Sequence, residues 1–461
     1  MINFNEGNLT AETMITEQFE DLNISTPSEF GVMVFDTNNS TGEDLDPLPE
    51  DTDTSVGATQ LTNIGWERDG QPLGTWTNDS NVVRVLVSGI EVADAVTANT
   101  LGGNDLIYSV VSSGIGLLND GILNTGNGND SLKGRVLGDG NDNIGILNVN
   151  DFEGSINTGT GADQIIGTVE INGRGDSNTG IVNGLIGNID TENNNDRIIG
   201  TVKVKGDGSF NIGIFSEGLN SIDTGRGKDQ ITGIVEIQGN GDSSTGFLNN
   251  NFTDTNTGKG DDQITGIVEI EGNGNDNNGI INGEAGISAA AGNDYIYGSV
   301  VVAKDGSGNS GISSGMGSID MGSGDDYIYG AVEVKGNGDN NFGIDNTAAN
   351  VIRMGSGDDR IIGEGVDAFT GFGGSVNGPG FINLDEGNDK ISGFGQQIVD
   401  GGTGTDLAEF EFSLDESIIL GSSDASSIDI TANEVTMSFT NVEEFAFANG
   451  SFTFDELIAS I

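Results

Sequence analysis

The amino-acid sequence predicts an all-β fold: a parallel β-solenoid, with rungs of about 33 residues and a β cap at each end. Three observations lead to this fold class. Aspartate and glycine return together about every 33 residues, apolar residues between these returns alternate with a period of two, and glycine clusters stand where turns are needed. No segment with helical periodicity separates the repeats, so coiling the chain into stacked rungs best satisfies the pattern.

Two columns of residues recur in phase. Aspartates precede the apolar alternations, with successive differences of 25, 33, 33, 33, 33, 32, 32, 33, 30 and 17 residues, at Asp105, Asp130, Asp163, Asp196, Asp229, Asp262, Asp294, Asp326, Asp359, Asp389 and Asp406. A glycine followed by Ile or Phe recurs at Gly145, Gly180, Gly213, Gly246, Gly279, Gly311 and Gly343. Ankyrin arrays have a similar period, but their helices and TPLHxA signature do not fit a chain without histidine.

Each repeat has one long strand and two shorter faces. In DQITGIVEIQG, which begins at Asp229, Ile231, Val235 and Ile237 share one face. The shorter faces would follow Gly-Ile and lie at SIDTG, residues 221–225. Rungs would stack about 4.8 Å apart, and right-handed winding is expected because parallel crossovers are almost always right-handed. Stacking predicts an interior ladder of Ile165, Ile198, Ile231, Ile264, Ile296, Ile328 and Ile361.

The two ends of the chain differ from the repeats. Residues 1–80 hold four of the five prolines and both tryptophans, which predicts an N-terminal cap or a small β domain. Residues 81–406 would form the solenoid. Residues 407–461 lose the glycine turns and gain alternating Phe, Ile and Val, which predicts a C-terminal β cap. Such caps are needed because an open solenoid end exposes unpaired backbone and an apolar core.

The charge of the chain excludes several partners. Against 72 Asp and Glu residues stand 16 Lys and Arg, a formal net charge of -56. Phosphate backbones and anionic membrane surfaces would repel such a protein, so nucleic acid is not an expected partner. No apolar run approaches the roughly 18 residues of a membrane span, so no membrane insertion is expected. Carboxylates in this number favour bound cations or high salt.

Cysteine and histidine are both absent. The chain therefore has no disulfide or thiolate site, and it lacks the commonest general base and transition-metal ligand. These absences favour a non-catalytic protein. A polysaccharide-active β-helix enzyme is the less favoured alternative. Carboxylate pairs such as Asp325-Asp326 and Asp358-Asp359 repeat with the corners and are better explained as structure.

The corner before each long strand carries glycine and aspartate, as in TGRGKDQIT at 224–232, TGKGDDQIT at 257–265 and MGSGDDRII at 354–362. These corners resemble the GGxGxDxUx nonapeptide of the RTX, or haemolysin-type, calcium-binding repeat family, where U is a large apolar residue. In that family calcium lies between neighbouring turns, held by Asp carboxylates and turn carbonyls. The resemblance implies Ca2+ as cofactor, with these metal ligands: Asp130, Asp163, Asp229, Asp262, Asp294, Asp326, Asp359, Asp389 and Asp406.

Several corners depart from the family pattern. The first glycine is mostly Thr or Met, TENNNDRII at 191–199 has lost its glycines, and AAAGNDYIY at 289–297 keeps only one. The ion row is expected to be interrupted at those two rungs. In the alternative interpretation, glycine, Asn and Asp merely satisfy left-handed corner conformations and the acids are solvated.

A second polar turn follows the long strand, as GRGDSN at 173–178, GNGDSS at 239–244 and GNGDNN at 336–341. These turns would either bind calcium or form a ladder of Asn and Asp residues. The ladder is favoured because the full GxGxD pattern is missing from them.

The C-terminal segment gives a second resemblance. Residues 435–461, VTMSFTNVEEFAFANGSFTFDELIASI, resemble the tail that follows calcium repeats in many large secreted bacterial proteins, with a TNxExxxFxxG core at Thr440 to Gly450. Those proteins leave by type I secretion, directed by an uncleaved C-terminal signal. The first residues of the chain hold no basic residue and no apolar run, so no cleavable secretory signal is expected there. The resemblance implies a secreted protein; an ordinary capping strand pair is the alternative.

These features together predict a secreted, non-catalytic, calcium-binding structural protein of the bacterial cell surface or extracellular matrix, in a surface layer, sheath or filament. Folding and self-association would depend on extracellular calcium. The alternative is a calcium-dependent adhesin or a glycan- or ice-binding module, with surface polysaccharide as partner. An outward aromatic patch would suit such binding, at Tyr295, Tyr297, Tyr327 and Tyr329. An ice-binding face would need a more regular threonine array than this column offers.

Overall fold

The long strand of each repeat pairs in parallel with its equivalent in the next repeat. In the computed structural model, β13 (Gln164–Ile171) pairs with β16 (Arg197–Val204), and β16 pairs with β19 (Gln230–Ile237), each without a register shift. The structure describes residues 59–459 except 63, 69, 70, 87, 151–153, 186, 220, 252, 253, 285, 347–349, 375–378 and 422–426. All of these residues belong to one compact unit, Ser55–Ile461. Most of the predicted N-terminal cap lies outside the described residues.

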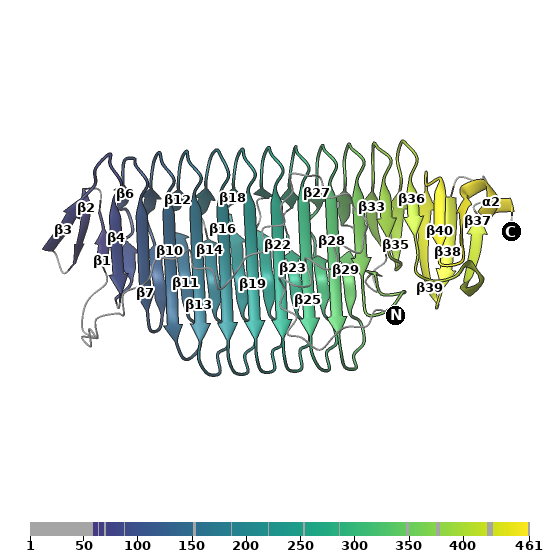
Figure 1. Ribbon diagram of the computed structural model, residues 1–461, viewed down its shortest axis with the longest axis horizontal. Helices are drawn as coiled ribbons and strands as arrows, with labels where there is room; N and C mark the ends of the chain where they lie inside the picture. Colours follow the sequence, from purple (N-terminus) through teal and green to yellow (C-terminus); the bar gives the residue numbers. More distant parts are fainter. Residues whose placement is uncertain are drawn as a thin grey trace. The chain divides into compact units, whose positions relative to one another are not determined.

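Three sheets run along this unit, and Figure 1 shows their strands stacked side by side along one axis. The long-strand sheet contains, in spatial order, β4 (Val82–Leu86), β7 (Leu106–Val111), β10 (Ser131–Gly138), β13, β16, β19, β22 (Gln263–Ile270), β25 (Tyr295–Val302), β28 (Tyr327–Val334), β31 (Arg360–Glu364), β34 (Lys390–Ser392), β36 (Leu407–Glu409), β40 (Glu444–Phe447) and β41 (Gly450–Thr453).

In each rung, the strand that comes after the second polar turn belongs to the middle-strand sheet. It contains β3 (Gln71–Thr75), β2 (Gly65–Arg68), β1 (Thr59–Leu61), β5 (Ile90–Val92), β8 (Ile115–Asn119), β11 (Ile144–Asn150), β14 (Thr179–Leu185), β17 (Ile212–Gly218), β20 (Thr245–Asn251), β23 (Asn278–Asn282), β26 (Ser310–Ser314), β29 (Phe342–Asn346) and β32 (Phe372–Gly373).

In each rung, the strand that comes before the GxGxD corner belongs to the short-strand sheet. It contains β37 (Ser417–Gly421), β38 (Ser427–Ala432), β39 (Val435–Thr440), β35 (Gln397–Asp400), β33 (Gly380–Asn383), β30 (Val351–Arg353), β27 (Ile319–Asp320), β24 (Ile287–Ser288), β21 (Thr255–Asn256), β18 (Ile222–Asp223), β15 (Asn188–Asp190), β12 (Ser155–Asn157), β9 (Ile122–Asn124) and β6 (Thr97–Asn99). The 3-10 helix η1 (Leu414–Glu416) and helix α2 (Phe454–Ala459) lie in the C-terminal segment.

These sheets confirm the predicted parallel β-solenoid with three strands per rung. The antiparallel pairings lie toward the two ends of the described chain, where β1 to β3 join at one end and β37 to β41 at the other. Leu457 of α2 is fully buried in the C-terminal part of the core. Antiparallel strands and a short helix suit a cap because they end the parallel stacking. The handedness and the boundaries at residues 80 and 406 stay predictions.

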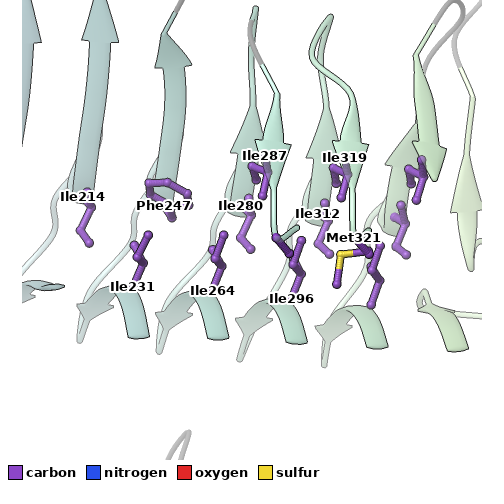
Figure 2. Packing of buried hydrophobic residues seen from close by; sticks show 14 of the residues in the cluster. Ile214, Ile231, Phe247, Ile264, Ile280, Ile287, Ile296, Ile312, Ile319 and Met321 are labelled. Atoms are coloured by element: carbon purple, nitrogen blue, oxygen red, sulfur yellow. The ribbon is translucent and has the colours of Figure 1, made fainter. Parts of the chain in front are cut away.

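The apolar core between the three sheets is built from inward ladders of side chains, one from each sheet around Ile231, and the long strands add further ladders at Val235 and Ile237. Figure 2 shows Ile231 of the long-strand sheet near Ile214 and Phe247 of the middle-strand sheet, with Ile287 and Ile319 of the short-strand sheet closing the same core. The predicted isoleucine ladder of the long strands is confirmed, because all seven members are at most 2% exposed. Full burial of one such side chain contributes about 1.5–3 kcal/mol, so every rung adds to the stability of its neighbours.

A contact between two glycine columns divides this interior into two apolar clusters. A Cβ added at Gly233 of β19 would lie 2.0 Å from the carbonyl oxygen of Gly246 in β20, so the two sheets touch backbone to backbone there. Ile231 lies in the cluster on one side of this contact, and Val235 and Ile237 lie in the cluster on the other side. The Gly-Ile column therefore recurs because a side chain would push the sheets apart.

Candidate metal centre

The aspartates of the GxGxD corners form one continuous column beside the first residue of each long strand. Each of these side chains is at most 2% exposed. Such burial is not expected from the sequence, because aspartate is a charged residue and lies here in a polar turn. The parallel register fixes this position, since Gln230 and Gln263, the residues after Asp229 and Asp262, are direct partners. The structure brings together all nine predicted ligands in this column: Asp130, Asp163, Asp229, Asp262, Asp294, Asp326, Asp359, Asp389 and Asp406.

One oxygen of each carboxylate links neighbouring rungs. The Oδ1 atom of Asp262 accepts a hydrogen bond of 2.8 Å from the backbone N–H of Asp229, and Asp229 in turn accepts one of 2.8 Å from Asp196. The same bond, 2.7–2.9 Å long, recurs along the column from Asp105 to Asp406. Each aspartate therefore satisfies a backbone donor that the turn would otherwise leave unpaired.

From Asp130 to Asp406, the other oxygen of each column carboxylate is buried and makes no hydrogen bond. This holds for the Oδ2 atoms of Asp130, Asp163, Asp196, Asp229, Asp262, Asp294, Asp326, Asp359, Asp389 and Asp406. A threonine hydroxyl lies beside several of them, but the hydroxyls of Thr125 and Thr224 donate to the carbonyl of the next rung. A buried ionised oxygen without a partner is costly, so the column needs protons or cations.

Burial is also the main cause of a raised carboxyl pKa at the ten column aspartates from Asp130 to Asp406. The backbone N–H donated by the preceding rung offsets part of the rise, and at several rungs a nearby threonine hydroxyl offsets more of it. Neighbouring carboxylates add to the rise at several rungs. The pKa rises from 3.8 to about 6 at Asp130, Asp229 and Asp406, to about 7 at Asp163, Asp262, Asp326, Asp359 and Asp389, and to about 8 at Asp196 and Asp294.

These shifts predict how the stability of the calcium-free protein depends on pH. A carboxyl whose pKa is raised by folding binds its proton more tightly in the folded state. Its contribution to the free energy of unfolding is therefore fully present below about pH 4 and is lost as the pH rises to about 8. In chelator, the urea midpoint is expected to be higher at about pH 5 than at about pH 8. Asparagine at Asp196, Asp229 and Asp262 together should flatten this dependence. A midpoint that rises with pH in the wild-type protein would contradict the prediction.

The corner backbone stacks closely at its second glycine, a position that only Asn194 fills with a side chain among the corners from Asp130 to Asp406. A Cβ added at Gly260, where φ is +146°, would lie 1.3 Å from the carbonyl oxygen of Gly227. Within the described residues, no backbone N–H donates a hydrogen bond to the carbonyl oxygens of Gly128, Gly227 or Gly260. The corners therefore present backbone oxygens that accept no backbone N–H, as well as the unpartnered carboxylate oxygens.

These oxygens fit calcium, which takes about six to eight hard oxygen ligands from carboxylates, carbonyls and water. Nowhere among residues 59–459, as far as they are described, do three acidic side chains converge into a ready-made metal cluster. An ion in the column would therefore draw on carboxylates of neighbouring rungs, together with corner carbonyls and water. Whether these aspartates bind metal stays a prediction.

Asp196 was missing from the predicted ligands. Its corner lacks glycine, yet Asp196 is fully buried, bonds both neighbouring rungs and has an unpartnered Oδ2 atom. Glu192 (φ +60°) and Asn194 (φ +89°) adopt the left-handed conformations that glycine supplies elsewhere. The hydrogen-bonded column therefore continues through this rung and through Asp294. The spacing of 33 residues from Asp163 and to Asp229 was the signal that locates Asp196.

The second polar turn forms side-chain ladders of its own. Asn178 and Asn211 are fully buried, and each bonds the equivalent residue of a neighbouring rung. Asp242 has Oδ1 bonds to the backbone N–H and side-chain amide of Asn275, at 2.8 and 3.0 Å. These contacts favour the Asn and Asp ladder that the sequence predicts for this turn.

The four tyrosines on the outward face are less available than the sequence suggests. The rings stack along the solenoid, with centroids 5.1 Å apart for Tyr295 and Tyr327 and 5.4 Å apart for Tyr297 and Tyr329. Tyr297 and Tyr329 are buried, and the Tyr329 hydroxyl donates to Glu364 at 2.6 Å. These two rings pack against neighbours instead of forming an open aromatic surface.

Comparisons with known proteins give a structural likeness but no family. Neither a family model nor a curated protein matches the chain. Among solved structures, a hyperactive, Ca2+-dependent, β-helical antifreeze protein from an Antarctic bacterium is similar, with 16% identity, coverage of 86% of this chain and 94% of that chain, and a TM-score of 0.26. No conclusion about the present chain rests on this likeness. Among the described residues, no helix is long and apolar enough to cross a membrane.

Proposed function

We propose that the protein is an extracellular, non-catalytic structural rod whose solenoid is stabilised by calcium bound along the aspartate column. The buried row of unpartnered carboxylate oxygens carries this proposal. None of the ion pairs among the described residues compensates a column carboxylate: the basic partners pair instead with Glu170, Glu236, Asp261, Glu333 and Glu409. Calcium would replace the missing partners, and it would reduce the repulsion within a chain of net charge -56.

Secretion, surface location and self-association belong to the same proposal. The resemblance of residues 435–461 to the tail of type I secreted proteins supports export. Outside the cell, millimolar calcium would order the rungs, because a ligand that binds only the folded state stabilises that state. Lateral or end-to-end contacts between such acidic rods would need bridging cations. Light scattering across a calcium series distinguishes an assembling rod from a monomeric one.

Two aspartate substitutions test the site itself. Asp229→Asn keeps an oxygen that accepts the Asp196 N–H but removes the buried charge. It is expected to weaken calcium binding at the neighbouring positions at least about tenfold, or about 1.4 kcal/mol. Asp242→Asn, in the second polar turn, is the matched control and should change the affinity by less than about twofold. Isothermal titration calorimetry measures both; equal losses in the two variants would contradict the assignment of the column.

A further inference from the structure

The C-terminal segment adds one more carboxylate to the aspartate column. Glu444 of β40 is the parallel partner of Leu407 in β36, so Glu443 lies in register with Asp406. The Oε2 atom of Glu443 accepts the backbone N–H of Asp406 at 2.9 Å, as each aspartate of the column does for the rung before it. Glu443 thus takes the place of the next aspartate, although its corner has no GxGxD sequence.

The rest of the TNxExxxFxxG segment holds Glu443 at this place. The Thr440 hydroxyl donates to the Val399 carbonyl at 3.2 Å, and the Asn441 amide donates to Asp400 at 2.8 Å. Phe447 packs into the core, with its ring centroid 5.0 Å from that of Phe410. The segment therefore attaches the cap to the last corner of the solenoid.

The two ends of the column differ in charge. At the N-terminal end stands Asn81, a neutral amide that donates to Asp105 through its backbone and side chain. Both oxygens of Asp105 are bonded, the second by the Thr100 hydroxyl. At the C-terminal end, the Asp406 Oδ2 atom is buried and unpartnered, and the exposed Glu443 adds a second negative charge beside it. None of the ion pairs found among the described residues involves Asp406 or Glu443.

The close packing of the last corner makes this end a defined site. A Cβ added at Gly401 would lie 2.6 Å from the Asp406 Oδ2 atom and 2.0 Å from the Asn441 carbonyl oxygen. Only a glycine therefore fits between the cap and the last aspartate. Glu443, unlike the buried aspartates, is open to solvent, so an ion could reach this end of the column without unfolding of the rungs.

We propose that Asp406 and Glu443 together bind a divalent cation that fastens the C-terminal cap to the last rung of the solenoid. This inference rests on the proposed calcium column and extends it by a residue outside the repeats. Binding at this position would couple the docking of β40, β41 and α2 to calcium. The cap would then cover the end of the core only when the ion is present.

The test uses the full chain with Glu443→Gln, and Glu444→Gln as the matched control. Glutamine at position 443 keeps an oxygen that accepts the Asp406 N–H, so a role of Glu443 in hydrogen bonding alone would survive the substitution. Glu444 suits the control because it is also exposed and lies one residue away. Bound calcium is counted by equilibrium dialysis, and the exchange of backbone amides in residues 444–459 is followed in calcium and in chelator. Glu443→Gln is expected to bind one ion fewer and to speed exchange of the cap amides in calcium about tenfold, with Glu444→Gln unchanged.

The outcomes separate this inference from the proposed function. Full calcium binding and a protected cap in Glu443→Gln would overturn the inference while the column proposal stands, because Glu443 would then act only as a hydrogen-bond acceptor. Absence of bound calcium in the wild-type protein would overturn both. Loss of cap protection in Glu443→Gln without a lost ion would also overturn it, since the charge would then act without a cation.

Discussion

A Gly233→Ala substitution is expected to lower the free energy of unfolding by about 3 kcal/mol, near the upper end of the usual cost of overpacking. The new methyl group would lie 2.0 Å from the Gly246 carbonyl oxygen and 2.5 Å from its carbonyl carbon. Both are backbone atoms of the opposite sheet, so no side-chain rotation relieves the clash. The two sheets would have to separate, which would also loosen both apolar clusters.

Gly173→Ala is the control for this substitution. Gly173 lies in the second polar turn, and the closest atom to an added methyl group there is the Asp139 Oδ1 atom at 3.6 Å. Its stability should change by less than about 1 kcal/mol. Urea unfolding of both variants in calcium gives the comparison. Similar midpoints for the two would show that the sheets do not meet at Gly233 as described.

Removal of calcium at neutral pH is expected to have the other large effect: the melting temperature of the solenoid should fall by about 10 °C or more. Each ion that binds only the folded state contributes about 2.7 kcal/mol at a concentration 100 times its dissociation constant. The loss of structure should be centred on residues 100–406, because the unpartnered carboxylates lie there. Circular dichroism melts in calcium and in excess chelator measure the shift.

Charge screening has to be separated from binding in these melts. Sodium chloride screens the charges of the surface carboxylates. It does not supply a divalent ion that, like calcium, binds six to eight oxygen ligands. Melts in chelator at matched ionic strength are therefore the control, and calcium should raise the melting temperature well beyond sodium. An equal melting temperature in calcium and chelator would contradict the proposed role of the column.

The fold was predictable because the repeat constrains it at every rung. A shift of one residue between neighbouring long strands would turn the isoleucine ladder outward, so the period and the alternation together fix the register. The contact between Gly233 and Gly246 was not predictable in the same way. The sequence shows that glycine recurs in both strands, but only the folded rung shows that these two columns face each other.

The candidate site was predicted in part. The spacing located the aspartate column, and burial then distinguished Asp229 from the exposed turn at Asp242. Asp196 was missed because glycine served as the signal, whereas Glu192 and Asn194 adopt the same left-handed turn. Glu443 was missed because it follows Asp406 by 37 residues without a GxGxD corner, so only strand pairing places it in the column.

Direct counting of calcium on the folded protein tests the central claim most closely. Equilibrium dialysis at about pH 7.5 would compare the wild-type chain with a variant carrying asparagine at Asp196, Asp229 and Asp262, with circular dichroism confirming that both are folded. The buried column predicts several ions per wild-type chain and fewer on the variant. A folded wild-type chain that binds no calcium, or a variant that binds as many ions as the wild type, would contradict the claim that the aspartate column holds them.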